Sequence, residues 1–221
     1  GAFISYTKQL ILFQVLALIT LISIPLVVIY LEESISYYIT LGLSAFVIFM
    51  GNSTSLASTA FSREGKALYD LKAMPISNRT IIFAKFLHVF IYVIISNIVI
   101  ILLAVGIFAG LGILDLISIL VPCFIKMFVL STLASIVLIV AEMFLDTANP
   151  KLNWENPTAA FKQNMNSMIG VFATLIIDAI YTLISIFVVP ANIIGFIILS
   201  GVFLVIAIPL CIVYIKYAEK R

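Results

Sequence analysis

Apolar runs of about 20 residues recur along the chain, separated by short polar connections. A run of that length crosses the hydrocarbon core of a bilayer as a helix, which bonds every backbone polar group within the segment. Hydrophobic residues make up 64% of the chain and charged residues 10%, and a soluble domain of this size cannot hide so much apolar surface. We therefore expect an all-α, polytopic integral membrane protein, with residues 1–221 as a single transmembrane domain. Six spans are predicted: 10–30, 38–61, 86–109, 116–144, 168–189 and 193–217.

The second run is the least apolar of the six. The string GNSTS at 51–55, followed by Ser58 and Thr59, interrupts it. We expect it to remain a helical span, because irregular backbone exposed to lipid leaves its hydrogen bonds unmade. The polar residues cover more than one helix face, so part of the run can instead face a polar cavity or another transmembrane subunit.

The basic residues predict an orientation for these spans. The connections 31–37, 110–115 and 190–192 contain no Lys or Arg. Eleven of the twelve basic residues fall on the opposite side: Lys8, Arg63, Lys66, Lys72, Arg79, Lys85, Lys151, Lys162, Lys216, Lys220 and Arg221. The positive-inside rule makes that side cytoplasmic. We therefore expect both termini in the cytoplasm, together with two cytoplasmic segments, 62–85 and 145–167.

A short amphipathic helix is predicted in the first cytoplasmic segment, between spans two and three. Its apolar residues share one helical stripe: Phe61, Leu68, Leu71 and Met74. Pro75 ends this helix, and Ser77 caps the next one, which runs on into the third span. The helix can lie on anionic membrane lipid or dock a cytoplasmic partner, and both roles can hold at once.

Two polar segments carry a family resemblance. The first is made of three strings: FSREGK at 61–66, LKAMPIS at 71–77 and AK at 84–85. The second is made of Asp146 and three strings: NPKLNW at 149–154, NP at 156–157 and KQN at 162–164. In this order, with two spans between them, they resemble bacterial ABC-type exporter permeases of the type-2 class, as found in Gram-positive bacteria. Members of that family are often longer, so the chain resembles their C-terminal six-span portion.

The resemblance implies a permease subunit in a bacterial plasma membrane, working with a separate ABC ATPase subunit that binds ATP and Mg²⁺. It also implies a second permease copy or a missing permease half as a partner. The ATPase-coupling residues would be Arg63, Glu64, Gly65, Lys66, Asp70, Lys72, Pro75 and Ser77. The sequence has no G-x-x-x-x-G-K-[ST] phosphate loop, so we expect no cofactor in this chain. We also expect no metal site, no catalytic residue and no nucleic-acid partner.

The second cytoplasmic segment has two interpretations. One is structural: Asn156 caps a helix that starts at Pro157, and Trp154 lies at the lipid headgroups. The other is an additional ATPase contact. Its candidate residues are Lys151, Asn153, Trp154, Lys162 and Asn164.

Lys126, Glu142 and Asp178 are the ionisable residues inside predicted spans. Such groups are costly in a bilayer and tend to face a partner or water. At ~1.5 Å per residue, Lys126 and Asp178 lie at similar depth on consecutive spans. We expect them to form an ion pair, although a polar route for substrate or protons is the alternative. We expect Glu142, near the cytoplasmic end of its span, to reach water or Lys151.

Other functional classes fit the sequence less well. A membrane-embedded enzyme lacks support, because the chain has one histidine and no H-E-x-x-H or G-x-S-x-G motif. A gradient-driven secondary transporter typically has inverted repeats and broken helices, and no convincing repeat is visible. A small membrane scaffold or immunity protein remains compatible with the sequence.

Overall fold

A computed structural model describes residues 33–110, 114–156, 159–189 and 193–219. The predicted span 10–30 lies outside these residues. Every regular element in the described part is helical, as expected from the apolar runs. The α-helices are α3 (Glu33–Asn52), α4 (Ala67–Ala73), α5 (Asn78–Gly110), α6 (Leu114–Ala148), α7 (Ala159–Lys162), α8 (Met165–Phe187) and α9 (Ile193–Glu219).

Four of these helices are long and apolar enough to cross a bilayer. The qualifying stretches are Asn78–Leu103, Val121–Ala148, Met165–Phe187 and Ile193–Glu219. They coincide with the third to sixth predicted runs, so the prediction of an all-helical fold with long apolar helices is confirmed for the described residues. The helices reach further than the runs do: α5 starts at Asn78 and α6 continues to Ala148.

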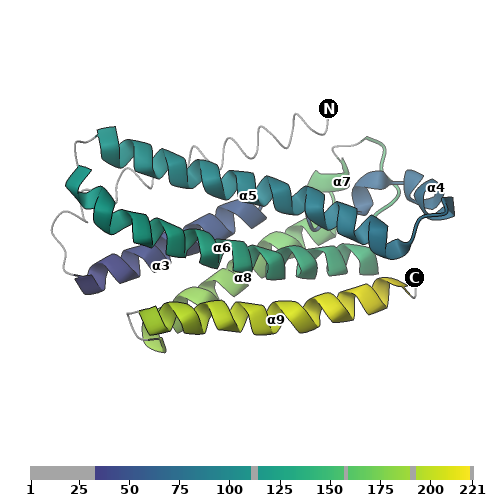
Figure 1. Ribbon diagram of the computed structural model, residues 1–221. Coiled ribbons are helices and arrows are strands. Elements are labelled where there is room, and N and C mark those ends of the chain that lie inside the picture. The colour runs from purple at the N-terminus through teal and green to yellow at the C-terminus, as the bar shows by residue number, and fades with distance from the viewer. Residues whose placement is uncertain (1–32, 111–113, 157–158, 190–192, 220–221) are drawn as a thin grey trace.

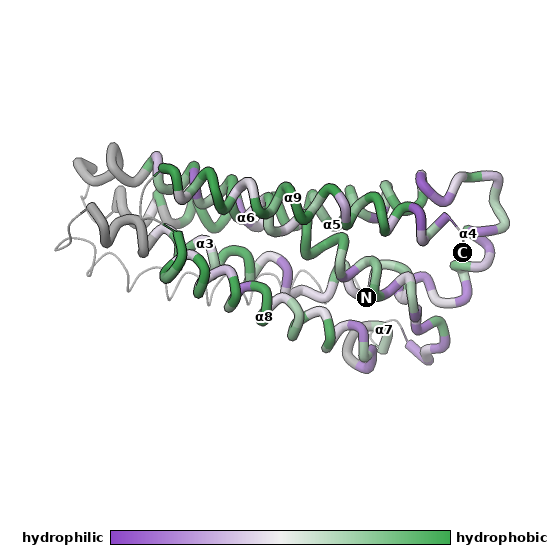
Figure 2. Tube along the Cα trace, turned by 90° about the horizontal axis from the view of Figure 1, so that it is seen from below, coloured by the Kyte–Doolittle hydropathy of each residue, from purple (hydrophilic) through white to green (hydrophobic). Residues whose placement is uncertain are grey.

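The long helices lie side by side in two layers (Figures 1 and 2). One layer contains α5, α6 and α9, and the other contains α3 and α8. The central helix is α6, which contacts α3, α5, α8 and α9 and is the most buried of the four candidate spans. Figure 2 also shows hydrophilic residues gathered where α4 and α7 lie. We call this end of the bundle the α4 end.

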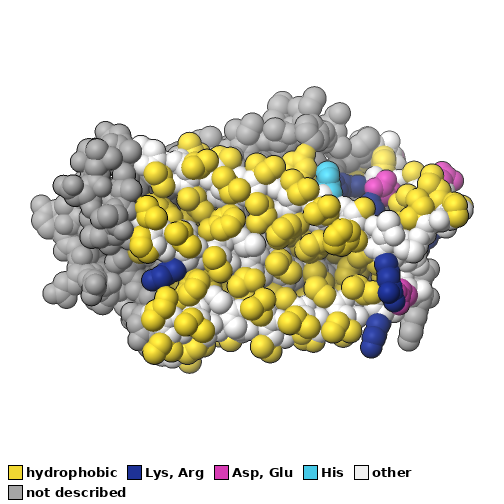
Figure 3. All heavy atoms as spheres, viewed as in Figure 1, with side chains coloured by type: hydrophobic (Ala, Val, Ile, Leu, Met, Phe, Trp, Pro, Cys, Tyr) yellow, Lys and Arg dark blue, Asp and Glu magenta, His cyan; other side chains and the backbone are white. Residues whose placement is uncertain are grey.

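The outer faces of the bundle are apolar. Large side chains such as Phe83, Leu102, Phe187 and Val205 are more than 60% exposed. In the view of Figure 3, hydrophobic side chains cover most of the described surface, and most charged side chains lie at the α4 end. A continuous apolar surface of this kind suits contact with lipid.

The second predicted span, 38–61, is wrong beyond Asn52. Helix α3 ends there, and residues 53–61 contain no α-helix. The Asn52 side-chain amide donates to the Ile48 carbonyl, and Ser55 adopts a left-handed φ of 58°, which an α-helix cannot continue through. Except for Ser55, which is half-buried, residues 53–62 are buried in protein, so their irregular backbone is not exposed to lipid. We call residues 53–62 the break segment.

The amphipathic helix is shorter than expected. Helix α4 follows Gly65 and ends at Ala73, because Met74 is already extended ahead of Pro75. Leu68 is buried and Leu71 half-buried, whereas Met74 is 50% exposed, so the predicted apolar stripe is wrong at that residue. The predicted cap is confirmed: Ser77 Oγ accepts the Thr80 N–H at 3.2 Å. From there α5 runs unbroken for 33 residues, as expected.

Candidate functional site

Asp146, near the end of α6, holds the break segment in place. One carboxylate oxygen, Oδ2, accepts the backbone N–H groups of Phe61 at 2.6 Å and Ser62 at 2.9 Å. The other, Oδ1, accepts the Ser62 hydroxyl and the Asn166 side-chain amide of α8. A carboxylate with several donors can remain buried, and Asp146 is fully buried. The break segment, α6 and α8 are therefore joined at one side chain.

The second predicted cytoplasmic segment folds back onto the first. The Lys151 N–H donates to Ser62 Oγ at 2.8 Å, and Trp154 Nε1 donates to the Ser62 carbonyl at 2.9 Å. The Trp154 ring also lies against Gly65, where a Cβ would stand 2.8 Å from Trp154 Cζ2. Gly65 has a φ of +55°, which glycine adopts without steric cost. Trp154 is thus part of a joint between the two segments.

The predicted coupling residues divide into an inner and an outer group. Arg63 donates to the carbonyls of Thr59 and Leu56, so it braces the break segment. Glu64 forms an ion pair with Lys85 at 2.5 Å, and the Lys85 ammonium also donates to the Ala60 carbonyl. The outer group is exposed on and after α4: Lys66, Asp70, Lys72, Pro75 and Ser77.

The Lys151, Asn153 and Asn164 side chains do not bond to Ser62, although the Lys151 N–H does. Lys151 Nζ donates to the Gln163 carbonyl at 2.7 Å, and Asn153 is exposed. Asn164 caps α8 by accepting the Asn166 N–H at 3.0 Å. The predicted cap at Asn156 is confirmed, since its side chain accepts the Ala159 N–H at 3.0 Å, whereas the predicted first helical residue, Pro157, lies outside the described residues. Lys162 belongs to α7, and its side chain lies outside the described part.

The expectation for Glu142 is wrong. Its side chain reaches neither water nor Lys151 and is 2% exposed. It accepts the Ser58 N–H at 3.1 Å and the Thr174 hydroxyl at 2.9 Å. The reason is that the break segment and α8 close over α6 at this level, with Gly170 allowing the close approach. A Cβ at Gly170 would stand 2.7 Å from Ser58 Oγ.

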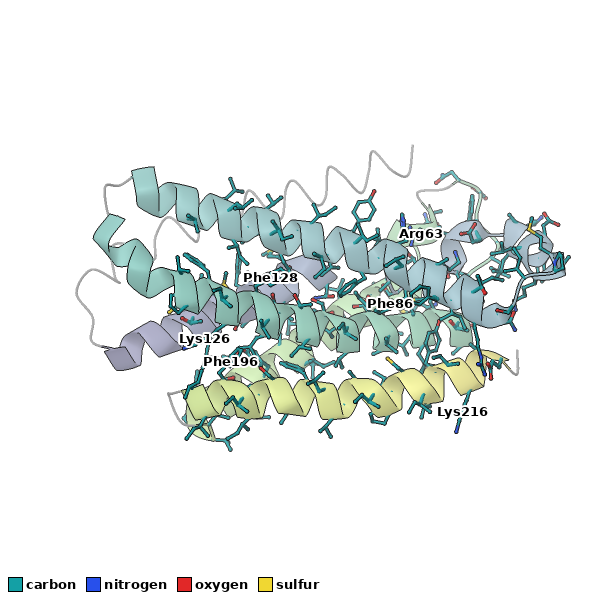
Figure 4. All side chains as sticks on the ribbon, viewed as in Figure 1. Arg63, Phe86, Lys126, Phe128, Phe196 and Lys216 are labelled. Atoms are coloured by element: carbon teal, nitrogen blue, oxygen red, sulfur yellow. The ribbon has the colours of Figure 1, made fainter. Side chains whose placement is uncertain are left out.

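The expected ion pair between Lys126 and Asp178 is not found among the described residues. Figure 4 shows Lys126 on α6 toward the end of the bundle opposite α4. Asp178 lies on α8, and its Oδ1 atom is buried without a hydrogen bond. Equal depth in the bundle does not by itself bring two side chains onto facing sides of their helices.

Several polar contacts were not predicted. Asn97 of α5 donates to Ser131 of α6 at 3.2 Å, and Asn52 of α3 donates to Ser135 of α6 at 3.0 Å. Ser167 of α8 donates to Ser55 at 2.6 Å. The polar run in the second predicted span was visible in the sequence, but its hydrogen-bond partners lie on two other helices, α6 and α8. Only the packing of those helices identifies them.

A groove of about 420 Å³ lies between the α3–α4 connection and the start of α5. Its lining combines charged groups with apolar residues: Arg63, Glu64, Leu71, Ile76, Thr80, Ile81, Ala84, Lys85 and His88. No cluster of three or more His, Cys, Asp or Glu residues that could hold a metal ion occurs in the described part of the chain. The arrangement at the α4 end is a braced protein joint with an exposed outer face.

No known protein family, curated protein or solved structure matches the chain.

Proposed function

We propose that the chain is the transmembrane permease subunit of an ATP-driven ABC exporter in a bacterial plasma membrane, with both termini cytoplasmic. On this proposal the α4 end faces the cytoplasm, and residues 62–85 bind a separate ATPase subunit. ATP and Mg²⁺ bind in that partner. The permease is completed by a second copy or by a missing permease half.

One observation carries the proposal: the segment after the break is braced on its inner side and exposed on its outer side. Asp146 and Trp154 attach Ser62 to α6 and to the second segment. Tyr69 of α4 is 65% exposed, and Met74, just after α4, is 50% exposed. Exposed aromatic and methionine side chains beside charged ones are typical of protein interfaces.

The charged residues on the outer face can fix the orientation in which an ATPase subunit docks. Lys66, Asp70 and Lys72 are exposed, and no ion pair within the described part involves any of them. Charged groups of both signs at the rim of an interface favour one docking orientation over others. An ATPase surface with an apolar recess flanked by both signs of charge would fit this face.

The experiment is co-purification from a bacterial host that expresses the tagged full chain under gentle solubilisation. We expect a P-loop ATPase to be recovered with the wild-type chain. A charge-reversed variant, Lys66→Glu with Asp70→Lys and Lys72→Glu, should lose it. Lys216→Glu is the matched control, because Lys216 is exposed at the same end of the bundle but on α9. Repeated absence of an ATPase from the wild-type preparation would exclude the proposal.

A second candidate, a gradient-driven secondary transporter, is favoured by one feature. Broken helices around ion sites are common in that class, and α3 breaks at Asn52 beside the buried Glu142. In cells, depletion of ATP with the ion gradients maintained distinguishes the two. Transport by an ABC exporter stops, whereas transport by a gradient-driven carrier continues until the gradient is collapsed with an ionophore.

A further inference from the structure

The Glu142 carboxyl is buried inside a candidate span with little to balance a negative charge. Its side chain is 2% exposed and lies within Val121–Ala148 of α6. Two neutral groups donate to it, the Ser58 N–H to Oε2 and the Thr174 hydroxyl to Oε1. No described residue forms an ion pair with it. An ionised carboxylate in such a place is strongly unfavourable unless a positive charge joins it.

Asp146, one turn further along the same helix, provides an internal comparison. It accepts four donors: two backbone N–H groups, a hydroxyl and a side-chain amide. Glu142 therefore has half as many donors, at a position that is just as buried. The Asp146 site is completed by the protein itself, whereas the Glu142 site is incomplete.

An unused oxygen lies next to Glu142. The Ser58 hydroxyl is fully buried beside the carboxyl and makes no hydrogen bond of ordinary geometry. It shares the same cramped space as the carboxyl, because a Cβ at Gly170 would stand 2.7 Å from Ser58 Oγ and 3.3 Å from Glu142 Cδ. A buried hydroxyl without a well-formed hydrogen bond is uncommon and is able to bind a further ligand.

Four oxygens thus converge from three parts of the chain: two from Glu142, one from Ser58 and one from Thr174. The break segment and α8 present neutral groups to the carboxyl: the Ser58 N–H and hydroxyl and the Thr174 hydroxyl. Carboxylate and hydroxyl oxygens are ligands for small hard cations. One negative charge is neutralised by one positive charge, which favours a monovalent ion over a divalent one.

We propose that Glu142, Ser58 and Thr174 form an intramembrane site for one small monovalent cation, either a proton or Na⁺. When a proton occupies it, the carboxyl becomes a neutral acid that donates one hydrogen bond. When Na⁺ replaces that proton, one H⁺ is released for each Na⁺ bound and the carboxylate becomes a ligand. This site does not depend on an ATPase partner, so the purified chain alone can be tested.

The sodium arm uses radioactive Na⁺ and the full chain in lipid nanodiscs. If the ion is Na⁺, the wild-type chain binds one Na⁺ saturably and releases about one proton as it does so, measured with a pH indicator in weak buffer. Glu142→Gln should lose this binding. Glu155→Gln is the matched control, because Glu155 is exposed outside the candidate spans and should leave binding unchanged.

The proton arm uses infrared difference spectroscopy of the same samples. If the ion is a proton, Na⁺ does not bind, and the wild-type spectrum contains the carbonyl stretch of a buried carboxylic acid at neutral pH. That band should be absent from Glu142→Gln and present in Glu155→Gln. A wild-type chain with neither saturable Na⁺ binding nor a Glu142-dependent acid band overturns the proposal.

A second variant keeps the test decisive if Glu142→Gln does not fold. Ser58→Ala removes only the unused hydroxyl and keeps the backbone N–H that Glu142 accepts. It should weaken Na⁺ binding by about tenfold or more in the sodium case, or shift the acid band in the proton case. An unchanged response in both arms would mean that Ser58 is not a ligand and would also overturn the proposal.

Discussion

Asp146 bonds twice to Ser62, accepting its backbone N–H at 2.9 Å and also its hydroxyl, across a separation of 84 residues. The same Ser62 accepts the Lys151 N–H and, through its carbonyl, the Trp154 indole N–H. Ser62 is therefore the residue at which α6, the break segment and the second polar segment meet. Substitutions at this joint can be tested on the purified chain by stability and spectroscopy alone.

Asp146→Asn should destabilise the protein. An amide in place of the carboxylate keeps only one acceptor oxygen. Its NH₂ group then faces either the Phe61 N–H or the Asn166 side-chain amide, both of which are donors. Leaving such groups unsatisfied costs about 1–3 kcal/mol each, so we expect a loss of about 3 kcal/mol in the free energy of unfolding. Thermal or denaturant unfolding in detergent measures it. Asp70→Asn, on exposed α4, should unfold like the wild type. Equal stability of the two variants would contradict a structural role for Asp146.

Gly65→Ala should disturb the joint between the two polar segments. The Gly65 backbone, with φ 55° and ψ −133°, costs an alanine about 1–3 kcal/mol, and the added Cβ displaces the Trp154 ring. Trp154 is the single tryptophan of the chain, so its fluorescence should shift to the red as it becomes more exposed. Gly106→Ala is the control, because no described atom lies within 4 Å of a Cβ there. An unshifted spectrum in Gly65→Ala would mean that Trp154 does not rest on this residue.

Ser55 and Ser167 should form a disulfide when both are changed to cysteine. Their hydroxyl oxygens are 2.6 Å apart, a separation that brings the Cβ atoms near disulfide distance. In a background without Cys123 and Cys211, mild oxidation should give an intramolecular band shift on electrophoresis that reductant reverses. Each single variant is the control and should show no such shift. If only dimers form, the break segment does not lie against α8.

Gly51→Ala should loosen the contact between α3 and α5. A Cβ at Gly51 would stand 3.1 Å from Asn97 Oδ1 and 3.3 Å from Val93 Cγ1. Both helices must then separate slightly, at a cost of about 1–2 kcal/mol. The midpoint of thermal unfolding reports the change. Gly42→Ala, with open space around the added methyl group, should not lower that midpoint, so comparable losses in both variants would indicate a general helix effect instead.

The long apolar helices after residue 85 could be predicted from the sequence, because a helix that crosses lipid must be long, apolar and internally hydrogen-bonded. A helix such as α9 needs only length and apolar composition to be recognised, and both are visible in the chain. The break at Asn52 could not be predicted in this way. It is stabilised by Glu142 and Asp146, which lie more than 80 residues away and supply acceptors to the irregular backbone.

Only part of the candidate site could be predicted from the sequence, because the rest depends on contacts between segments that are distant along the chain. The exposed residues Lys66, Asp70 and Lys72 could be selected from the sequence, because they carry charge on a short amphipathic segment. The environment of Glu142 could not be predicted from the sequence. Its position along α6 gives its depth in the bundle, but it does not show that the break segment and α8 cover the side chain. The pairing of Trp154 with Gly65 likewise depends on how two loops fold against each other.

The length of α5 determines how a movement at the α4 end reaches the opposite end of the bundle. It contains no proline, whereas α6 contains Pro122 and α9 contains Pro209. At 1.5 Å per residue it extends about 50 Å as one stiff rod. Ser77 caps α5 directly after the exposed connection from α4. A displacement of that connection therefore meets no proline kink within α5 that could absorb it. Such a displacement tilts α5 as a whole and therefore moves the end of α5 that lies opposite the α4 end.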